Sequence, residues 1–513
     1  MKKSVALLVI LALMLSVLAG CGSSSTTKKE DANINETRNL VIAQGGYPQT
    51  LDIQYQSDVF AARPASMVFE KLVDLKPDGE FKGVLAESWD LPDDTTIVFH
   101  LRKNVKFHNG DPMTAEDVKW SLIRAIESPY VGSKVSFIDK DSINIVDENT
   151  IEIHYLYPNA SALYGFQQAG ASILPSKLYA SAESSDISAN PIGTGPYKYV
   201  SAVNGESVTF VRNDEYWGEK AKIKNLIWQN ISENANRTIE LETGGASFAY
   251  DVPVTDITKI QENKDLVLLQ GQGTTIQAAF YNTETPGPLA DVNVRKALGY
   301  AVDKKAILAA AYNNIGSVAK GPLLDVIKYS TQDLEVPEFD MDKAKAALKD
   351  AGYGNGFNLR IYTNENQYRI DAAQVIQNAW KQLGVNTEIT TLEYAAYTSA
   401  INSGDFDVCM FGWVSNGDPD NALYGLYHSS MIGGSNWAHT NDPKIDSLLD
   451  KARQTLDDKA RGEVYVDVQK AICEYYPGTW YYQSVNTNAH SAKLANIEYT
   501  IYNYEPWTWE WTE

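Results

Sequence analysis

The feature that most limits the fold is the alternation of helical and strand patterns between residues 290 and 475. Apolar residues recur there at the spacing of an amphipathic helix, and short apolar or alternating runs separate these segments. Helices that alternate with strands are typical of α/β domains, in which helices cover a sheet. The sequence predicts helices near residues 294–302, 340–351, 370–383, 445–456 and 464–472.

Residues 405–421 form the strongest candidate for a binding surface. Val408 to Phe411 is an apolar run with the length of a buried strand, and Gly412 and Trp413 follow at its carboxyl end. Residues 416–420 then form a polar turn with two carboxylates. Because ligands of open α/β sheets bind beyond the carboxyl ends of strands, this stretch predicts a binding wall. The alternative is a core tryptophan followed by an acidic surface turn.

The N-terminus has the pattern of a bacterial lipoprotein signal. Two lysines precede an apolar run over residues 5–18, which is too short for a membrane span. The run ends in Leu-Ala-Gly-Cys21, which resembles a lipobox, where the cysteine is lipidated after cleavage. We therefore expect a signal peptide over residues 1–21, a lipid on Cys21 and a flexible tether over residues 22–37. The alternative is an ordinary signal peptide with an incidental cysteine.

Charge and cysteine content limit the partners of the chain. The formal net charge of −21 opposes binding to nucleic acid and to anionic lipid surfaces. Cys409 and Cys473 either pair or are buried thiols, and we favour buried thiols because free cysteine is among the most buried residue types. His428 and His439 are eleven residues apart and lack a metal-ligand spacing, so neither a metal site nor a cofactor is expected.

Four segments carry a resemblance to one known family. They are "VLAESWDLPDDTTIVFHLRKNVKFHNGDPMTAEDVKWSLIRA" (residues 84–125), "NPIGTGPYKYV" running on to "VRNDEYWG" (190–218), "DVNVRKALGYAVDKKAIL" (291–308) and "GDFDVCMFGWVSNGDPDN" (404–421). In order and spacing they resemble the extracytoplasmic solute-binding proteins of peptide- and nickel-type ABC importers, called family 5. The likeness covers essentially the whole chain after the signal peptide.

The resemblance implies a type II periplasmic-binding-protein fold. Two α/β lobes are expected, joined by a hinge of two chain crossovers, with an extra domain inserted in the first lobe. The implied division is lobe I at 38–77, 190–279 and 484–513, inserted domain II at 78–189, and lobe III at 280–483.

The resemblance also implies a role in transport rather than catalysis. We expect the membrane-tethered subunit of an ABC importer, a monomer that captures oligopeptides between its lobes and delivers them to a permease and its ATPase. It would lie outside the cytoplasm, anchored through Cys21 to the outer face of the cell membrane.

Several residues are expected to contact the peptide. Trp413 would flank it, and backbone groups of Gly412 to Ser415 would pair with its main chain. Tyr47, in the glycine-rich loop after the first strand, would contribute from lobe I. Tyr130 and Tyr482 are further candidates, and for each tyrosine the alternative is an ordinary core or surface aromatic.

The sequence departs from the family at the residues that bind the peptide termini. Dipeptide and oligopeptide binders usually carry an aspartate soon after this tryptophan, which pairs with the ligand amine. Here Asn416 or Ser415 takes that place, and Asp418 is either a substitute or a turn residue. Dipeptide binders also carry an arginine for the carboxylate near the position of Thr363, whereas this chain has Arg369 several positions later.

Three other functions have to be weighed against peptide import. The solute of the same fold is alternatively a nickel chelate, an oligosaccharide or a modified peptide. The chain is alternatively a lipoprotein that senses peptides. An enzyme is disfavoured, because neither His-Glu-x-x-His nor Gly-x-Ser-x-Gly occurs and neither cysteine has an activating neighbourhood.

Overall fold

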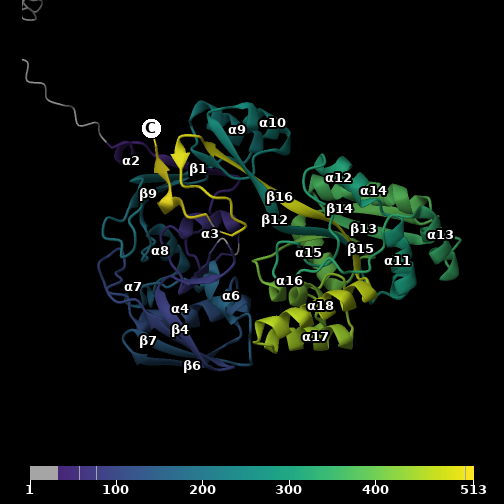
Figure 1. Ribbon diagram of the computed structural model, residues 1–513, viewed down its shortest axis with the longest axis horizontal. Helices are drawn as coiled ribbons and strands as arrows, with labels where there is room; N and C mark the ends of the chain where they lie inside the picture. The colour runs from purple at the N-terminus through teal and green to yellow at the C-terminus, as the bar shows by residue number, and fades with distance from the viewer. Residues whose placement is uncertain (1–32, 57, 77, 503, 513) are drawn as a thin grey trace, which may run out of the picture.

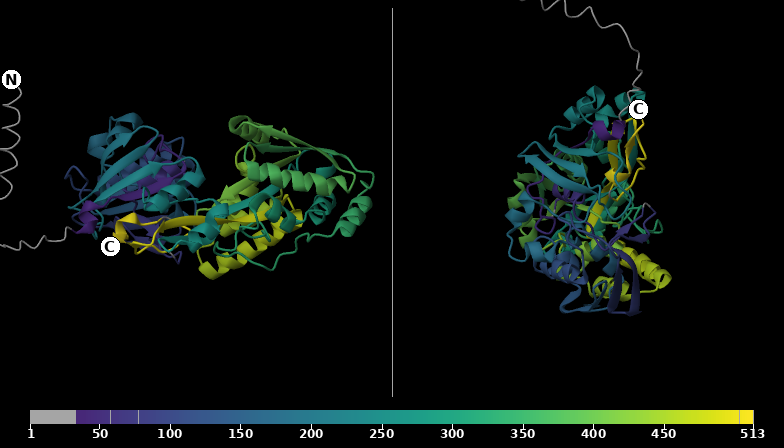
Figure 2. Two further views of the ribbon diagram at one scale, coloured as in Figure 1. Left: turned by 90° about the horizontal axis from the view of Figure 1, so that it is seen from above. Right: turned by 90° about the vertical axis from the view of Figure 1, so that its left-hand side faces the viewer.

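The computed structural model describes residues 33–512 except 57, 77 and 503, so the predicted signal peptide and Cys21 lie outside the described residues. Two α/β lobes lie side by side and are joined by two long antiparallel strands, β12 (Leu266–Tyr281) and β16 (Gly478–Ser491) (Figure 1). A single ten-stranded sheet, ordered β14-β13-β15-β12-β16-β11-β1-β10-β9-β8, runs through both lobes. The left view in Figure 2, seen from above, shows the same two bodies.

The first lobe is built on a mixed sheet. Strand β1 is parallel to both β10 and β11, while β8 and β9 extend the sheet as an antiparallel edge. Its elements are α2 (Ile34–Thr37), β1 (Leu40–Gln44), α3 (Val59–Ala65), α7 (Ser176–Tyr179), α8 (Ser184–Ala189), β8 (Tyr197–Val203), β9 (Ser207–Arg212), β10 (Asn225–Asn230), α9 (Asn234–Thr243), β11 (Phe248–Ala249), η2 (Val254–Asp256), α10 (Ile257–Glu262), β17 (Leu494–Ala495), η5 (Pro506–Thr508) and β18 (Glu510–Trp511).

The inserted domain is a four-stranded antiparallel sheet covered by helix α4. Thr114 and Asp117 form the capping box that begins this helix, as their spacing predicts. The apolar core of the domain extends from Leu72 to Ile173, whereas α7 and α8 pack on the core of lobe I. Its elements are β2 (Val73–Leu75), β3 (Phe81–Gly83), β4 (Ala86–Asp93), β5 (Thr96–Leu101), α4 (Ala115–Glu127), α5 (Gly132–Val135), β6 (Ile138–Asp147), β7 (Thr150–Tyr155), α6 (Ala162–Gln167) and η1 (Ala169–Ala171).

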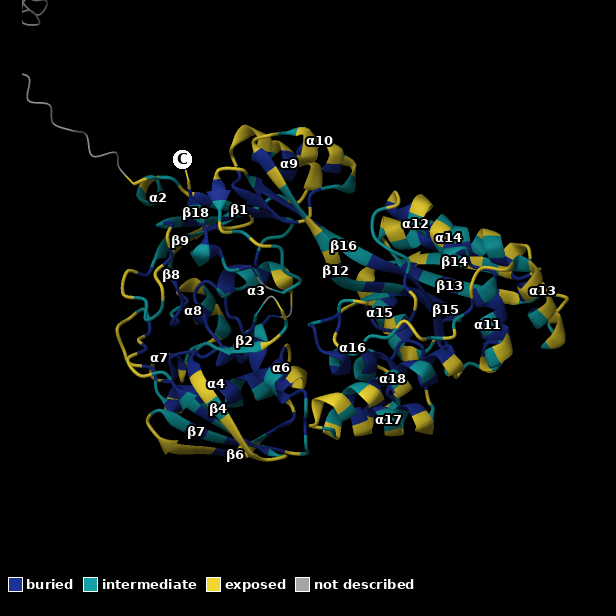
Figure 3. Ribbon diagram, in the orientation of Figure 1, coloured by how far each residue is buried: buried dark blue, intermediate teal, exposed yellow. Residues whose placement is uncertain are grey.

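In lobe III, helices surround the strands β13, β14 and β15. This lobe has its own apolar core, so buried residues gather separately in each lobe (Figure 3). All five helices predicted between residues 290 and 475 are present. Its elements are η3 (Pro288–Ala290), α11 (Val292–Tyr300), α12 (Lys304–Tyr312), α13 (Met341–Asp350), β13 (Asn358–Asn364), α14 (Gln367–Lys381), β14 (Asn386–Leu392), α15 (Tyr394–Ser403), β15 (Val408–Val414), α16 (Pro419–Tyr427), η4 (Ser429–Met431), α17 (Pro443–Gln454) and α18 (Asp458–Tyr475).

The pairing of β12 shows where the chain passes between the lobes. Residues 266–272 pair with β16, and residues 275–281 pair with β15 of lobe III as well. A register shift falls between Gln272 and Ile276, and it separates the two regions. The predicted boundary between lobe I and lobe III, after residue 279, therefore falls inside the sheet of lobe III and not at its border. The sequence of β12 reads as one continuous strand and does not show which strands pair with its two halves.

The structure corrects the end of the predicted tether. Residues 34–37 form α2, and Asn35 accepts a hydrogen bond from the Trp511 amide at 2.7 Å. Glu36 forms an ion pair with Arg212 at 2.7 Å. These partners are distant in sequence, so the polar composition of residues 33–37 gave no sign that they attach to lobe I.

Cys409 and Cys473 are both buried and unpaired, which confirms the prediction of buried thiols. Within the described residues, no helix combines the length and the apolar character needed to cross a membrane.

Candidate functional site

Strand β15 ends in an edge that is open on one side. Strand β13 pairs with it through Ile361–Val408 and Tyr362–Cys409 and, among the described residues, at no later position. On the other side, β12 pairs with β15 along its whole length. Residues 410–414 therefore continue beyond the last paired residue of β13, along an edge to which no strand of the described chain is hydrogen-bonded.

The hydrogen-bond alternation of β15 shows which amides face this open edge. The main-chain carbonyl of Asp407 accepts from the main-chain amide of Asn282 at 2.9 Å, and the main-chain amide of Ser415 donates to the carbonyl of Thr274 at 2.8 Å. The main-chain groups of odd-numbered residues of β15 therefore point toward β12. Even-numbered residues point the other way, and the Met410 carbonyl accepts from the Tyr397 hydroxyl on that side at 2.7 Å. The amide groups of Gly412 and Val414 are thus directed away from β12, where an added strand can bind them.

Arg369 lies beside the open edge, in the first turn of α14. Its Nη1 donates to the Asn364 side chain at 3.0 Å, where β13 ends, and its Nε donates to the Gln277 side chain at 3.2 Å. Its Cζ lies 4.6 Å from the centroid of the Phe411 ring. Within the described residues both side-chain hydrogen-bond acceptors of Arg369 are neutral amides, so its positive charge is available to an anionic ligand group.

Trp413 is held in place at the carboxyl end of β15 but is not fully buried. Its Nε1 donates to the Asn421 side chain at 3.2 Å, and its ring lies 5.8 Å from the ring of Trp437. The neighbouring Val414 is 62% exposed. The arrangement is compatible with a ligand-flanking role, which stays a prediction.

The polar turn after β15 forms hydrogen bonds mainly within itself. The Ser415 hydroxyl accepts from the Gly417 amide at 3.3 Å, and the Asn416 side chain accepts from the Asp418 amide at 3.0 Å. Asp418 begins α16 by accepting from the Asp420 amide at 3.1 Å. These bonds are those of a helix-capping turn, and they leave Ser415 and Asn416 as candidates whose side chains already have local partners.

Asp418 is almost completely buried, and its carboxylate faces a cation of its own lobe. Its Oδ1 lies 3.5 Å from Nη2 of Arg461, and the residue is 3% exposed. Burial raises the pKa of Asp418 to about 6, although Arg461 favours the charged form. The geometry therefore favours the turn-residue alternative for Asp418 over the role of partner to a peptide amine.

The three candidate tyrosines lie in three different parts of the molecule. Tyr47 is half-buried just beyond β1, and burial raises the pKa of its hydroxyl. Tyr130, in the inserted domain, is 51% exposed and lies 6.0 Å from the ring of Tyr55. Tyr482 is buried in β16, where its ring stacks on Tyr312 at 3.6 Å. Their roles toward a ligand stay predictions, and the stacked ring of Tyr482 favours packing.

Sequence reasoning missed a second arginine, Arg63 of α3. Its guanidinium stacks on Tyr250, which directly follows β11, with 3.7 Å between Cζ and the ring centroid. Its Nη1 is buried and lacks a hydrogen-bond partner within the described part of the chain. Because Tyr250 is 187 positions away from Arg63 in the sequence, no local pattern indicates this contact.

These features define a bilobal solute-binding protein, with paired hinge strands and an open strand edge in one lobe. Residues 80–434 match the family described as bacterial extracellular solute-binding proteins, family 5, and the chain belongs to this family. The predicted family and its type II periplasmic-binding-protein fold are thereby confirmed.

Similar proteins cover almost the whole chain. Heme-binding protein A of Haemophilus influenzae is 30% identical to this chain, in an alignment that covers 90% of each of the two chains. The dipeptide-binding protein of Escherichia coli is 29% identical over 86% of this chain and 88% of its own. The structure of the periplasmic binding protein DppA of Helicobacter pylori, in complex with the peptide STSA, has a TM-score of 0.80 and 25% identity, covering 93% of this chain and 98% of that one.

Proposed function

We propose that the protein is the peptide-capturing subunit of an ABC importer, which holds oligopeptides between its lobes and delivers them to a permease and its ATPase. Family membership supports this role, as do relatives whose names describe dipeptide and di- or tripeptide binding. The single observation that carries it is the open edge of β15, where the amides of Gly412 and Val414 face outward.

An extended peptide would add to this edge as a further strand. Main-chain hydrogen bonds give affinity that is independent of the side chains, and side chains then project alternately to the two faces. Trp413 would lie against one face of the bound peptide. Capture of this kind needs no chemical step, and members of the family are solute-binding proteins.

Arg369 would bind the carboxylate of the peptide. It lies at the end of β13, beside the edge that a peptide would extend, and its present partners are neutral amides. A comparable pairing for the peptide amine is not favoured, because Asp418 already faces Arg461. The protein is therefore expected to require a free C-terminal carboxylate and to tolerate a blocked N-terminus.

Calorimetry with matched peptides tests this assignment. A free peptide, its N-acetylated form and its C-amidated form are titrated into the wild type and into Arg369→Gln. We expect amidation to weaken binding by about 2 kcal/mol in the wild type, the range for a charge-assisted hydrogen bond, and to have little effect in Arg369→Gln. Arg360→Gln, at the opposite end of β13, serves as the matched control. Equal losses on amidation in all three proteins would contradict the role of Arg369.

A second experiment tests the added strand directly. Peptides are prepared with a single N-methyl group at each successive amide, which removes one donor at a time. A strand bound along one edge donates only at alternate residues, so affinity should fall at every second position and persist between them. Loss at every position, or at none, would refute pairing with β15.

Other solutes remain alternatives within the family. Structures of relatives include one in complex with Ni(L-His) and one in complex with agropinic acid. Among the described residues, no group of three histidine, cysteine or acidic side chains is placed to hold a metal ion. Native mass spectrometry of the purified protein identifies a co-purified ligand, and an oligosaccharide or metal chelate there would replace the peptide proposal. A role in sensing is tested by whether deletion of the permease abolishes the cellular response to peptide.

We also propose that Cys21 carries a lipid that anchors the protein to the outer face of the cell membrane. The pattern of residues 1–21 supports this, and the family is described as extracellular. The residues between Cys21 and α2 would serve as the tether, and the protein would act as a monomer.

A further inference from the structure

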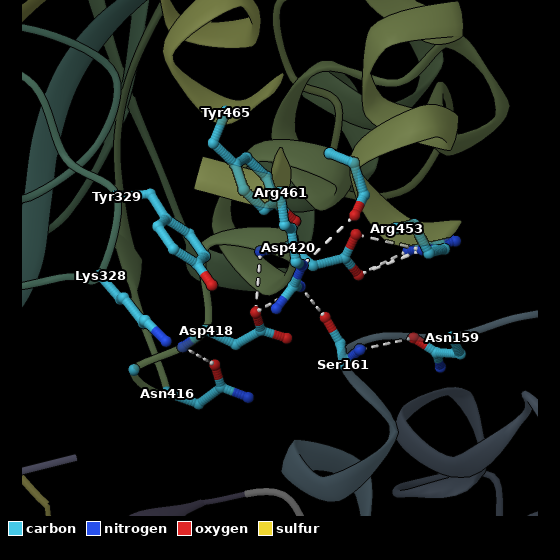
Figure 4. A network of polar contacts seen from close by, with 12 residues as sticks. Asn159, Ser161, Lys328, Tyr329, Asn416, Asp418, Asp420, Arg453, Arg461 and Tyr465 are labelled. Carbon is cyan, nitrogen blue, oxygen red and sulfur yellow. Dashed lines mark hydrogen bonds and ion pairs between the residues drawn. The ribbon is translucent and has the colours of Figure 1, made fainter. Parts of the chain in front are cut away.

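Two hydrogen bonds join the inserted domain to lobe III, and the one between Arg461 and Ser161 is drawn in Figure 4. The Ala160 amide donates to the Arg453 carbonyl at 2.8 Å. Nη2 of Arg461 donates to the Ser161 hydroxyl at 2.5 Å. Ser161 and Arg461 are 300 residues apart in sequence, and they belong to the two bodies that β12 and β16 connect.

Lobe III holds both arginines in position by its own residues. Arg453 binds the Asp420 carboxylate through Nε and Nη2, with the shortest distance 2.8 Å, and lies 3.3 Å from the Tyr424 ring centroid. Arg461 is 5% exposed, and its Nη2 also lies 3.3 Å from the Tyr465 hydroxyl and 3.5 Å from Asp418. The Arg461 guanidinium is thus pre-oriented for the Ser161 hydroxyl, whereas Arg453 offers Ala160 its main-chain carbonyl near the end of α17.

On the opposite side, the inserted domain presents a short ordered loop. The Ser161 amide donates to the Asn159 side chain at 2.9 Å, which fixes the turn that carries Ala160 and Ser161. Figure 4 shows Ser161 next to Arg461, with Asn159 in the same loop. Ser161 and Arg461 are therefore each held by contacts within their own domain.

We propose that Ser161 and Arg461, supported by the Ala160–Arg453 bond, form a latch that stabilises the closed arrangement of the lobes and so prolongs ligand residence. If the lobes separate about β12 and β16, these bonds must break and water must reach Arg461 and Asp418. The latch acts on closure and not on the ligand, so Ser161 and Arg461 are positioning residues. The inference rests on the proposed function only in its consequence for ligand release.

The latch makes a prediction that a ligand contact does not make. A residue that touches the ligand affects different ligands unequally, whereas a bond that exists only in the closed form weakens every ligand by the same factor. Removal of one charge-assisted hydrogen bond is expected to lower the closed-to-open ratio about ten-fold. The melting temperature of ligand-free Ser161→Ala should stay close to that of the wild type, because the interior of neither domain changes.

Single-molecule energy transfer measures the closed-to-open ratio. Dyes are attached at Asp141→Cys in the inserted domain and at Lys345→Cys in α13, both exposed positions. The native Cys409 and Cys473 are buried, and Cys21 is replaced by serine in the labelled protein, so labelling is confined to the introduced sites. The ratio is measured in the labelled protein without ligand and in the presence of trialanine and of trileucine.

We expect Ser161→Ala to lower the ratio about ten-fold in each condition, and Ser133→Ala, an exposed serine of the same domain, to leave it unchanged. Arg461→Gln should produce no further loss when it is combined with Ser161→Ala. An unchanged ratio in Ser161→Ala, a loss that differs between the two peptides, or full additivity in the double variant would each overturn the latch. If neither peptide changes the closed-to-open ratio of the wild type, the proposed function loses support. The comparison of ligand-free wild type with ligand-free Ser161→Ala still tests the latch.

Discussion

Glu70 is a carboxyl group buried where the inserted domain meets the first lobe. Its oxygens accept hydrogen bonds from the Tyr216 hydroxyl at 2.6 Å and from Nε1 of Trp217 at 2.9 Å. Burial raises the pKa of Glu70 from 4.5 to about 7, although both donors and Arg102 favour the charged form. Because Tyr216 and Trp217 follow β9 of lobe I, ionisation of Glu70 places a charge in the junction between the two domains.

The direction of the pH dependence follows from the raised pKa. A carboxyl group that binds its proton more tightly in the native state than in the unfolded chain stabilises the native state below pH 4.5 and loses this contribution as the pH rises through about 7. The full shift corresponds to roughly 3 kcal/mol, and most of this contribution is lost between pH 5 and pH 8.

The substitution Glu70→Gln isolates this contribution, because glutamine has nearly the same shape and no charge at any pH. The free energy of unfolding is measured by guanidinium titration at intervals from pH 5 to pH 8. We expect the wild type to lose roughly 2–3 kcal/mol more than Glu70→Gln over this range, and the exposed Glu80→Gln control to follow the wild type. Parallel profiles for the wild type and Glu70→Gln would refute the assignment of a raised pKa to Glu70.

Three further substitutions test the site and the anchor. Trp413→Ala should weaken peptide binding by about 2 kcal/mol or more in calorimetry; a loss of thermal stability with unchanged affinity would instead make Trp413 a core residue. Asp418→Asn should weaken free and N-acetylated peptides equally, and a selective loss for free amines would restore Asp418 as their partner. Cys21→Ser should move the protein from the membrane fraction to the soluble fraction, and continued sedimentation with membranes would contradict the lipid anchor.

The elements that sequence patterns predicted best are those with local signals. The capping box of Thr114 and Asp117, which begins α4, depends on residues within one helical turn. The strand at Val408 was also identified, because four consecutive apolar residues between polar neighbours have few other placements. Such signals fix where elements begin and end.

The candidate site depended on contacts that no local pattern encodes. The open edge of β15 exists because β13 stops pairing after Tyr362, which is a property of two strands about 45 residues apart. Arg369 becomes a candidate for carboxylate binding only because α14 places it beside that edge. The family resemblance directed attention to Thr363 instead, six positions earlier, where an arginine would reach the same region from the strand rather than from the helix.

The carboxylates of the acidic turn after β15 form ion pairs within lobe III. Asp420 is committed to Arg453 and Asp418 faces Arg461, so both carboxylates neutralise cations of lobe III. The same two arginines present a guanidinium and a carbonyl to the inserted domain, which is the contact proposed to stabilise closure. Under the proposed function, recognition would then fall to the main-chain amides of β15 and to Arg369. A binding protein built this way would gain affinity from main-chain pairing and from lobe contacts, neither of which depends on ligand side chains, and that combination would suit peptides of varied sequence.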